Sequence, residues 1–263
     1  MSVAVLTGCS AGPAPAVTPG DEVGTTTEAE VTWVVDGDTI EVAVSGGQIT
    51  VRLLAINAPD DGECFADDGL DHLIETLKGR RVSLETFGED QYGRALAHVF
   101  MEDRHVNVEM VEMGLALAST PGEGDPYRDE ILEAEQVAFE GGMGLWSAAA
   151  CGSRGLLPQV VIDPELSVID AAGPDDQNLS GETLDLVNEG ADAVDTSGWI
   201  LRDESSRHRF VFPLASRLER GERLRVASDD PGWDPGASPV WNNDGDMALL
   251  QMPDGTVVSR WRY

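Results

Sequence analysis

The chain has 263 residues, is 41% hydrophobic and carries a formal net charge of −31. It is therefore long enough for one large or two ordinary domains with cores of their own, and it has no apolar run near the ~18 residues of a membrane span. Lys78 is its sole lysine. Because phosphate affinity comes from Lys and Arg, this composition excludes nucleic-acid binding through bulk charge and leaves only a small local basic site.

The first nine residues end in "LTGC", after a short apolar stretch. This segment resembles a bacterial lipoprotein signal, in which the Cys becomes lipidated, although no basic residue precedes the apolar stretch. We expect a truncated signal over 1–9, lipidation of Cys9, and export to the cell surface or secretion, with membrane contact only through the lipid. The alternative is a tail with an accidental Cys. Residues 10–29 are rich in Pro, Gly and Thr and are expected to form a disordered linker.

Residues 30–148 show a mixed pattern of strands and helices. Strand-like runs lie at "EVTWVVDGDTIEVAV", "QITVRLLAI", "RVSLETF" and "ALAHVFM". Helical spacing occurs over 69–78, in "VNVEMVEMGLA" and in "PYRDEILEAEQVAFEGG". In the second of these helices, Val108, Val111 and Met113 are expected to face inward. Five strands with three helices predict a small barrel with packed helices, which is an α+β fold.

Beyond a linker expected at 149–160, the pattern becomes all-β over 161–263. Strand-sized runs alternate with turn residues, and no helical period appears. This pattern is typical of a β-sandwich. The expected core positions are Leu184, Leu186, Val194, Trp199, Ile200, Phe210, Phe212, Leu224, Val226, Leu249 and Val257.

Charged residues interrupt the first two strands where the pattern expects core residues. Asp36 and Asp38 stand at one strand start, Arg52 lies in the next strand, and a turn over 57–60 follows it. Guanidinium groups fit phosphate oxygens, and a hard cation prefers carboxylate and carbonyl oxygens, so these residues could converge at one barrel mouth and serve such groups. Taken singly, Asp-Gly-Asp is usually just a turn, and Arg52 can pair with any nearby acid.

Together, "VVDGDTIEV", "VRLLAINAPDD", "DQYGRALAHVF", "MVEMGLA" and "GLW" resemble the thermonuclease (staphylococcal-nuclease-like) family over roughly 30–148. The resemblance implies a five-stranded OB-fold barrel with helices and calcium-dependent phosphodiester cleavage. It also implies calcium ligands at Asp38, at Asn57 and at the Ala58 carbonyl. Asp36 starts the same turn and is expected to support it.

The same resemblance assigns the groups that act on the phosphate. Arg52 and Arg94 would bind it, Tyr92 would contact it, and Asp60 would be the general base. Two positions depart from the family, which usually has Asp at 57 and Glu at 60. Asn keeps an oxygen ligand with one charge less, and the shorter Asp60 leaves Glu63 or Asp61 as alternative bases. The sequence thus leaves two readings, a nuclease for DNA or RNA and a non-catalytic surface binding protein with a degenerate barrel.

The segment 161–263 resembles the lamin-tail domain, an immunoglobulin-like sandwich, through "ETLDLVNEGADAVDTSGWILRD" and "WNNDGDMALLQMPDGTVV". It shows no nucleophile–base arrangement, so a binding or positioning role is expected. An arginine cluster stands out in this acidic chain. It fits either an anionic partner or intramolecular pairing with the abundant acids, and we favour pairing. Its members are Arg202, Arg207, Arg209, Arg217, Arg220, Arg223 and Arg225.

The remaining cysteines predict a disulfide. If Cys9 carries lipid, Cys64 and Cys151 are left, and an even number in an exported chain is expected to pair. In the thermonuclease fold, the last helix packs on the barrel, so the segment after it is expected to approach the loop with Cys64. The four histidines show no ligand or triad spacing. The protein is expected to be a monomer.

Overall fold

The computed structural model describes separate stretches of the chain. Cys9 and the whole signal expected at 1–9 lie outside them, as do most of the linker expected at 10–29 and Arg207. The described residues are 24–119, 125–152, 157–169, 179–204, 208–233, 240–241 and 246–263.

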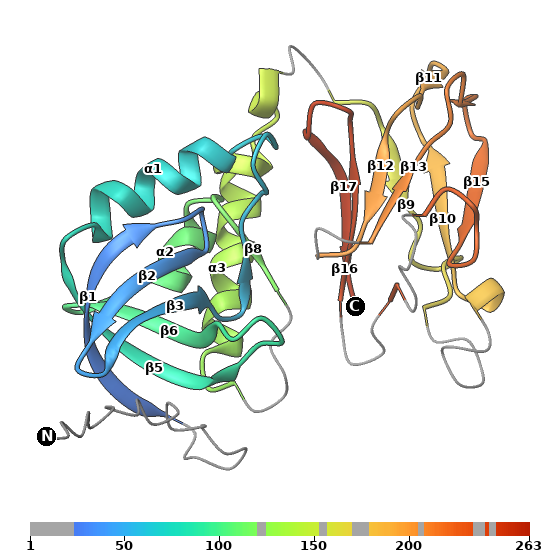
Figure 1. Cartoon of the computed structure of the whole chain (residues 1–263). Helices are drawn as coiled ribbons and strands as arrows, with labels where there is room; N and C mark the ends of the chain where they lie inside the picture. Colours follow the sequence, from blue (N-terminus) through green and yellow to red (C-terminus); the bar gives the residue numbers. More distant parts are fainter. Residues whose placement is uncertain are drawn as a thin grey trace, which may run out of the picture.

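Five strands of the N-terminal half form a closed barrel, seen on the left in Figure 1. Their order is β3-β2-β1-β5-β6, and the barrel closes where β3 pairs with β6 in parallel, with Val51 opposite Ala95. The predicted barrel is therefore confirmed. The strands are β1 (Thr25–Val34), β2 (Thr39–Val44), β3 (Gly47–Leu53), β5 (Arg81–Glu89) and β6 (Ala95–Met101). Three short strands are added, β4 (Ile56–Asn57), β7 (Arg104–His105) and β8 (Leu117–Ala118).

The first strand begins earlier than the sequence suggested. Residues 25–30 pair with residues 81–86 of β5, with Thr25 opposite Thr86. The expectation of a disordered linker is thus wrong for residues 25–29. Threonine is a good strand former, and pairing with β5 satisfies the backbone groups of this polar run, which outweighs its linker-like composition.

Three helices pack on the barrel, α1 (Ala66–Leu77), α2 (Val106–Glu112) and α3 (Arg128–Gly141). Helix α2 buries Val106, Met110 and Val111. The expectation that Met113 faces inward is wrong, because the helix ends at Glu112 and the Met113 side chain is 38% exposed.

The "GLW" motif forms the short 3₁₀ helix η1 (Gly144–Trp146) and locks the end of α3 onto the barrel. The Leu145 amide donates to the Gly114 carbonyl at 2.9 Å. Both Gly114 and Gly144 have positive φ, and a Cβ on either would collide with the backbone of the other segment. Glycine at both positions therefore permits this close approach.

The C-terminal half is an antiparallel sandwich, on the right in Figure 1. One sheet contains β9 (Val160–Ile162), β10 (Thr183–Asn188) and β15 (Arg223–Ala227). The other contains β12 (Ile200–Arg202), β13 (Arg209–Val211), β16 (Met247–Gln251) and β17 (Val257–Arg262), and β11 (Val194–Asp195) pairs with β14 (Arg217–Leu218). Most expected core residues are buried between the sheets, including Leu184, Trp199 and Phe212.

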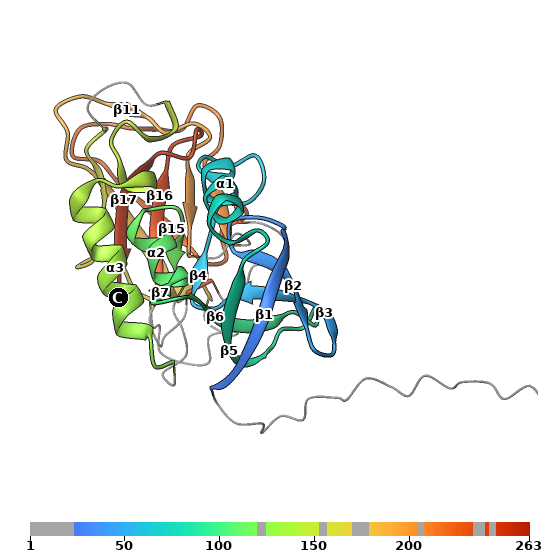
Figure 2. The same ribbon diagram turned by 90° about the vertical axis from the view of Figure 1, so that its left-hand side faces the viewer.

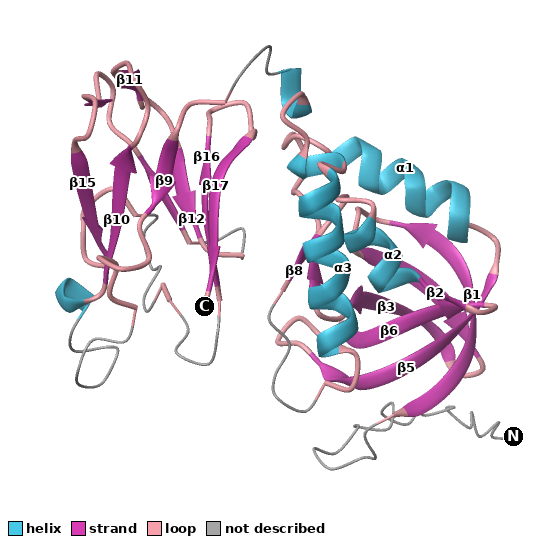
Figure 3. Ribbon diagram, turned by 180° about the vertical axis from the view of Figure 1, so that it is seen from behind, coloured by secondary structure: helices cyan, strands magenta, loops and turns pink. Residues whose placement is uncertain are grey.

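Leu249 and Val257 serve a different core. Along β16, Ala248 and Leu250 face the sandwich interior, whereas Met247 and Leu249 join Val257 against the barrel domain. There they form a buried cluster with Leu117, Ala138, Leu145 and Trp146. Helix α3 and β8 lie on the side of the barrel that faces β16 and β17 (Figures 1 and 3).

Ion pairs reinforce this junction. Helix α3 runs alongside β17 (Figure 2), and its Glu135 is 1% exposed. The Glu135 carboxylate accepts hydrogen bonds from the Ala118 amide at 2.9 Å, from Arg262 Nη2 at 2.9 Å and from Arg260 Nη1 at 3.2 Å. Arg260 also stacks over the Phe139 ring, 3.8 Å from its centroid. The sandwich is therefore fixed to the barrel by apolar and charged contacts.

Among the helices in the described stretches, none is both long and apolar enough to cross a membrane.

Candidate functional site

Asp38 joins three parts of the barrel mouth. The Asp36 carboxylate accepts the Asp38 amide at 3.0 Å, so it shapes the turn before β2, as expected. The Asp38 Oδ2 atom accepts the Ala58 amide at 2.8 Å and lies 2.9 Å from Arg52 Nη1. The acid just before β2 is thus the partner of the arginine on β3.

Arg52 is fixed by hydrogen bonds as well as by charge. It lies opposite Thr39 in the β2–β3 ladder. Its Nη1 atom donates to the Ile56 carbonyl at 3.0 Å, and its Nη2 atom donates to Asn57 Oδ1 at 2.9 Å. Such a guanidinium, held by acceptors on several sides, is pre-organised for an anion.

Burial changes the chemistry of Asp38. Desolvation raises the pKa of its carboxyl to about 7, the nearby Arg52 guanidinium opposes this rise, and Asp36 adds to it. A buried carboxyl with this pKa gains from a further positive charge beside it.

A tight turn presents Tyr92 and Arg94. The Asp90 carboxylate accepts the Tyr92 and Arg94 amides at 2.9 and 3.0 Å and pairs with Arg94 Nε at 2.7 Å. Arg94 lies over the Tyr92 ring, 5.6 Å from its centroid. A cavity of about 430 Å³ is lined by Arg52, Tyr92 and Arg94 together with Ser119. The structure thus brings both predicted phosphate-binding arginines and the tyrosine to one cavity.

The predicted bases lie on the turn after Asn57. Asp60 and Asp61 are exposed, and neither lines this cavity as the structure describes it. Glu63 is half-buried, and its carboxylate is engaged by Arg209, by Arg202 at 3.6 Å and by the Asp60 amide at 3.1 Å. Burial alone would raise the pKa of Glu63, but the two arginines and this hydrogen bond hold it below its usual range. The engaged Glu63 is therefore a weaker candidate base than Asp60.

The cysteines pair as the sequence led us to expect. Cys64 and Cys151 form a disulfide with a Cα–Cα distance of 5.5 Å. Cys151 lies in the short 3₁₀ helix η2 (Ala150–Gly152), within the segment expected to be a linker. The disulfide therefore ties the turn after Asn57 to the end of the barrel domain.

Sequence reasoning missed the sandwich residues near this site. The Glu204 carbonyl accepts the Asn57 side-chain amide at 2.9 Å, and Arg202 and Arg209 bind Glu63. The arginine cluster was the only available signal, and it does not reveal which acids the arginines meet. Arg217 and Arg225 pair with Glu219 and Asp185. Pairing within the chain thus accounts for four of the arginines.

A second polar cluster lies away from the cavity. His98 Nδ1 is 3.0 Å from His105 Nε2, and His98 Nε2 is 3.0 Å from Asp125 Oδ2. Phe100 stacks on His105, with ring centroids 4.5 Å apart. Burial, together with the neighbouring His98, lowers the pKa of His105 to about 3, and Asp125 partly opposes this shift. No spacing signal in the sequence marks this cluster, because the pairing of β6 with β7 brings the two histidines together and Asp125 comes from the segment before α3.

Comparison with known proteins agrees with both halves of the fold. The family model described as Staphylococcal nuclease homologue matches residues 50–148, and that of the Lamin Tail Domain matches 162–263. An uncharacterized endonuclease of Haemophilus influenzae is 34% identical over 113 residues, which are 43% of this chain and 62% of that protein. This chain thus spans less than two thirds of that relative.

Two further relatives carry nuclease names. A micrococcal nuclease of Shigella flexneri is 32% identical over 127 residues, covering 45% of this chain and 72% of that protein. A thermonuclease of Staphylococcus intermedius is 31% identical over 121 residues, covering 43% and 72%. Both matches fall short of half of this chain.

Proposed function

The chain belongs to the staphylococcal nuclease homologue family and carries a lamin tail domain over residues 162–263, and we propose that its barrel hydrolyses phosphodiester bonds in DNA, RNA or both. The observation that carries this proposal is the cavity of about 430 Å³ that gathers Arg52, Tyr92 and Arg94 beside the buried Asp38.

The two arginines would act on the phosphate. Asp90 engages Arg94 through Nε, so the terminal nitrogens of Arg94 are the ones to meet phosphate oxygens. Arg52 would approach the same phosphate from β3. Two guanidinium groups stabilise the charge that develops on the pentacoordinate anion, and Tyr92 would contact the phosphate. Asp60 would take the proton from the attacking water; its carboxylate is exposed on the turn after Asn57, and Glu63 holds its amide.

Calcium would be held beside Asp38. The Asp38 carboxylate, the Ala58 carbonyl and the Asn57 amide oxygen are hard donors of the kind that Ca²⁺ prefers, and the raised pKa of Asp38 marks a buried acid that gains from a cation. Among the described residues, no three acidic, His or Cys side chains converge on one point, so other ligands would come from backbone and solvent. When bound, the cation would supply positive charge for the reacting phosphate.

Asn57 supports one alternative function. It carries no charge, and its amide is engaged by Arg52 and by the Glu204 carbonyl. A weakened cation site would leave a barrel that binds an anionic polymer without cutting it. The discriminating property is turnover, since both functions predict binding.

We also propose that the protein acts outside the cytoplasm, attached to the cell surface through lipid on Cys9 or secreted. The Cys64–Cys151 disulfide supports this location, because such bonds persist in oxidising compartments.

The test is a cleavage assay on the full chain with labelled DNA and RNA. We expect cleavage with calcium, its loss with EDTA, and a fall of about 100-fold or more in kcat for Arg94→Ala, which removes a phosphate ligand. Arg217→Ala is the matched control, because Arg217 pairs with Glu219 on the exposed surface of the sandwich. Binding without cleavage by the wild-type chain would instead establish the alternative function.

A further inference from the structure

The sandwich domain contacts the turn over 57–64, here called the acidic turn, through the Asn57 and Glu63 side chains, and it packs against the disulfide at the end of this turn. The acidic turn connects β4 to α1 and carries Ala58, Asp60 and Asp61. Its anchoring residues are Asn57, which lies at its start, and Glu63 and Cys64, which lie at its end.

The first anchor is the Asn57 side chain. Its Oδ1 atom accepts from Arg52 Nη2 at 2.9 Å, and its Nδ2 atom donates to the Glu204 carbonyl at 2.9 Å. A guanidinium can only donate and a carbonyl can only accept. The amide therefore has a single orientation that satisfies both partners, and the sandwich backbone keeps its oxygen directed at Arg52.

The second anchor is the Glu63 carboxylate, which is shared between the turn and the sandwich. It accepts the Asp60 amide at 3.1 Å, and the Asp60 carbonyl accepts the Glu63 amide at 2.8 Å. From the other side, Arg209 bonds to Glu63 and Arg202 lies 3.6 Å away. The Arg202 side chain is only 4% exposed. Because charge-assisted bonds are strong and directional, the two arginines fix the group that fixes the Asp60 backbone.

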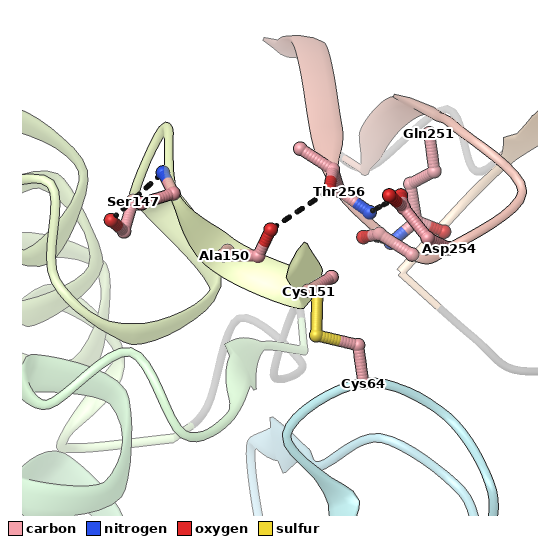
Figure 4. Close-up of a disulfide and its surroundings, with 9 residues drawn as sticks. Cys64, Ser147, Ala150, Cys151, Gln251, Asp254 and Thr256 are labelled. Carbon is pink, nitrogen blue, oxygen red and sulfur yellow. Dashed lines mark hydrogen bonds between the residues drawn. A yellow bond between two sulfur atoms is a disulfide. The ribbon is translucent and has the colours of Figure 1, made fainter. Parts of the chain in front are cut away.

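The third anchor is the disulfide at the end of the turn (Figure 4). Gly255 lies in the turn between β16 and β17, and a Cβ on it would come 2.9 Å from Cys64 Cβ. Next to it, Thr256 Oγ1 donates to the Ala150 carbonyl at 3.1 Å. A cavity of about 170 Å³ lies between the domains here, lined by Asn57 and Glu63 from one side. The sandwich hairpin thus packs directly against the disulfide.

These contacts admit two explanations. If they only join the domains, breaking one lowers stability and leaves catalysis unchanged. However, all three fall on the one turn that carries the proposed base, and the Asn57 contact reaches Arg52 itself. Resting on the proposed nuclease function, we infer that the lamin tail domain is a positioning part of the cleavage site. It holds the acidic turn so that Asp60 and the Asn57 side-chain oxygen keep their positions relative to Arg52.

The test uses Arg209→Ala in the full chain, with Arg209→Lys to restore one charge and Arg217→Ala as the surface control. We expect Arg209→Ala to lower kcat by about tenfold or more, since small displacements of a catalytic group are costly, and to change KM by less than about twofold. The lysine variant should recover part of kcat. Hydrogen exchange gives an independent readout, and the Asp60 amide should exchange faster in Arg209→Ala than in the control.

The outcomes separate the two explanations. Unchanged kcat in Arg209→Ala, with or without faster exchange, would overturn the inference and leave only a joining role. A lower kcat with unchanged Asp60 exchange would also overturn it, because Arg209 would then act by another route. Absence of cleavage by the wild-type chain would instead remove the proposed function. The Asp60 exchange rate would then decide alone whether the sandwich holds the turn.

Discussion

At the scale of single residues, Asp38 and Arg52 explain each other. A buried acid and a strand arginine are both costly alone, since each would lose hydration without compensation. Paired at 2.9 Å and joined to the Ala58 amide, they become the hub of the barrel mouth. Burial favours the neutral form of the Asp38 carboxyl, and Arg52 favours its charged form. The pair therefore offers a guanidinium for an anion and a carboxylate for a cation at one site.

His105 provides a residue-scale prediction about acid stability. Its pKa is about 6.5 when unfolded and about 3 in the fold, so the unfolded chain binds the proton more tightly. The associated stability is complete above pH 6.5 and is lost as pH falls toward 3, with an upper limit of about 5 kcal/mol. His105→Gln, which keeps a polar partner for His98, should lose less stability over this range. Urea unfolding from pH 7 to pH 4 measures the difference.

Other groups in the cluster limit how much His105→Gln can change the pH dependence of stability. Burial alone would raise the pKa of Asp125, but its bonds to His98 and the Tyr127 amide hold it below the usual range. The stability that Asp125 contributes to the fold is therefore also lost on acidification. Some acid lability should remain in His105→Gln. Identical pH dependence in the two proteins would show that His105 does not titrate as a buried neutral group.

Among the elements, the disulfide closes a covalent loop that begins on the acidic turn. Cys64 and Cys151 are 87 residues apart. The chain-entropy model gives roughly 4–5 kcal/mol for such a loop. The double variant Cys64→Ala/Cys151→Ala should therefore unfold at lower urea concentration, and reductant should lower the midpoint of the wild type but not of the variant. A midpoint shared by the wild type and the variant would refute this contribution.

The sequence was informative wherever an element shows its own periodicity. The alternation in β2 and β3 and the helical spacing at Leu73 and Leu77 identified the barrel and α1. Element ends were less certain. β1 extends back to Thr25 because β5 offers it a partner, and Met113 lies outside α2 because the helix ends one residue earlier.

The contacts between the two domains have no corresponding periodicity in the sequence. Arg262 meets Glu135 across 127 positions, and Arg209 meets Glu63 across 146. Local patterns cannot show which of 48 acidic residues an arginine meets. Leu249 illustrates the same limit, since the sequence marks it as buried without showing that the barrel covers it. The grouping of Arg52, Tyr92 and Arg94 on the barrel could thus be predicted, and the contacts that the sandwich makes with Asn57 and Glu63 could not.

At the scale of the whole molecule, a chain of charge −31 is proposed to act on a polyanion. Long-range repulsion therefore opposes the encounter and is screened by salt. Affinity has to come from a few arginines held in place, as Arg52 is by Asp38 and Asn57. The buried junction between the domains serves this need, because it lets a second domain stiffen a small basic site.

The cavity around Arg52 is proposed to be the place where phosphodiester bonds are broken. Single-turnover cleavage of labelled DNA with calcium, comparing the wild-type chain with Arg52→Ala, measures this. The control is Arg225→Ala, whose side chain is 59% exposed and pairs with Asp185. We predict a rate at least ~100-fold lower for Arg52→Ala, measured well below its melting temperature, which should fall because Asp38 loses its buried partner. Equal rates in the wild type and Arg52→Ala would contradict the claim.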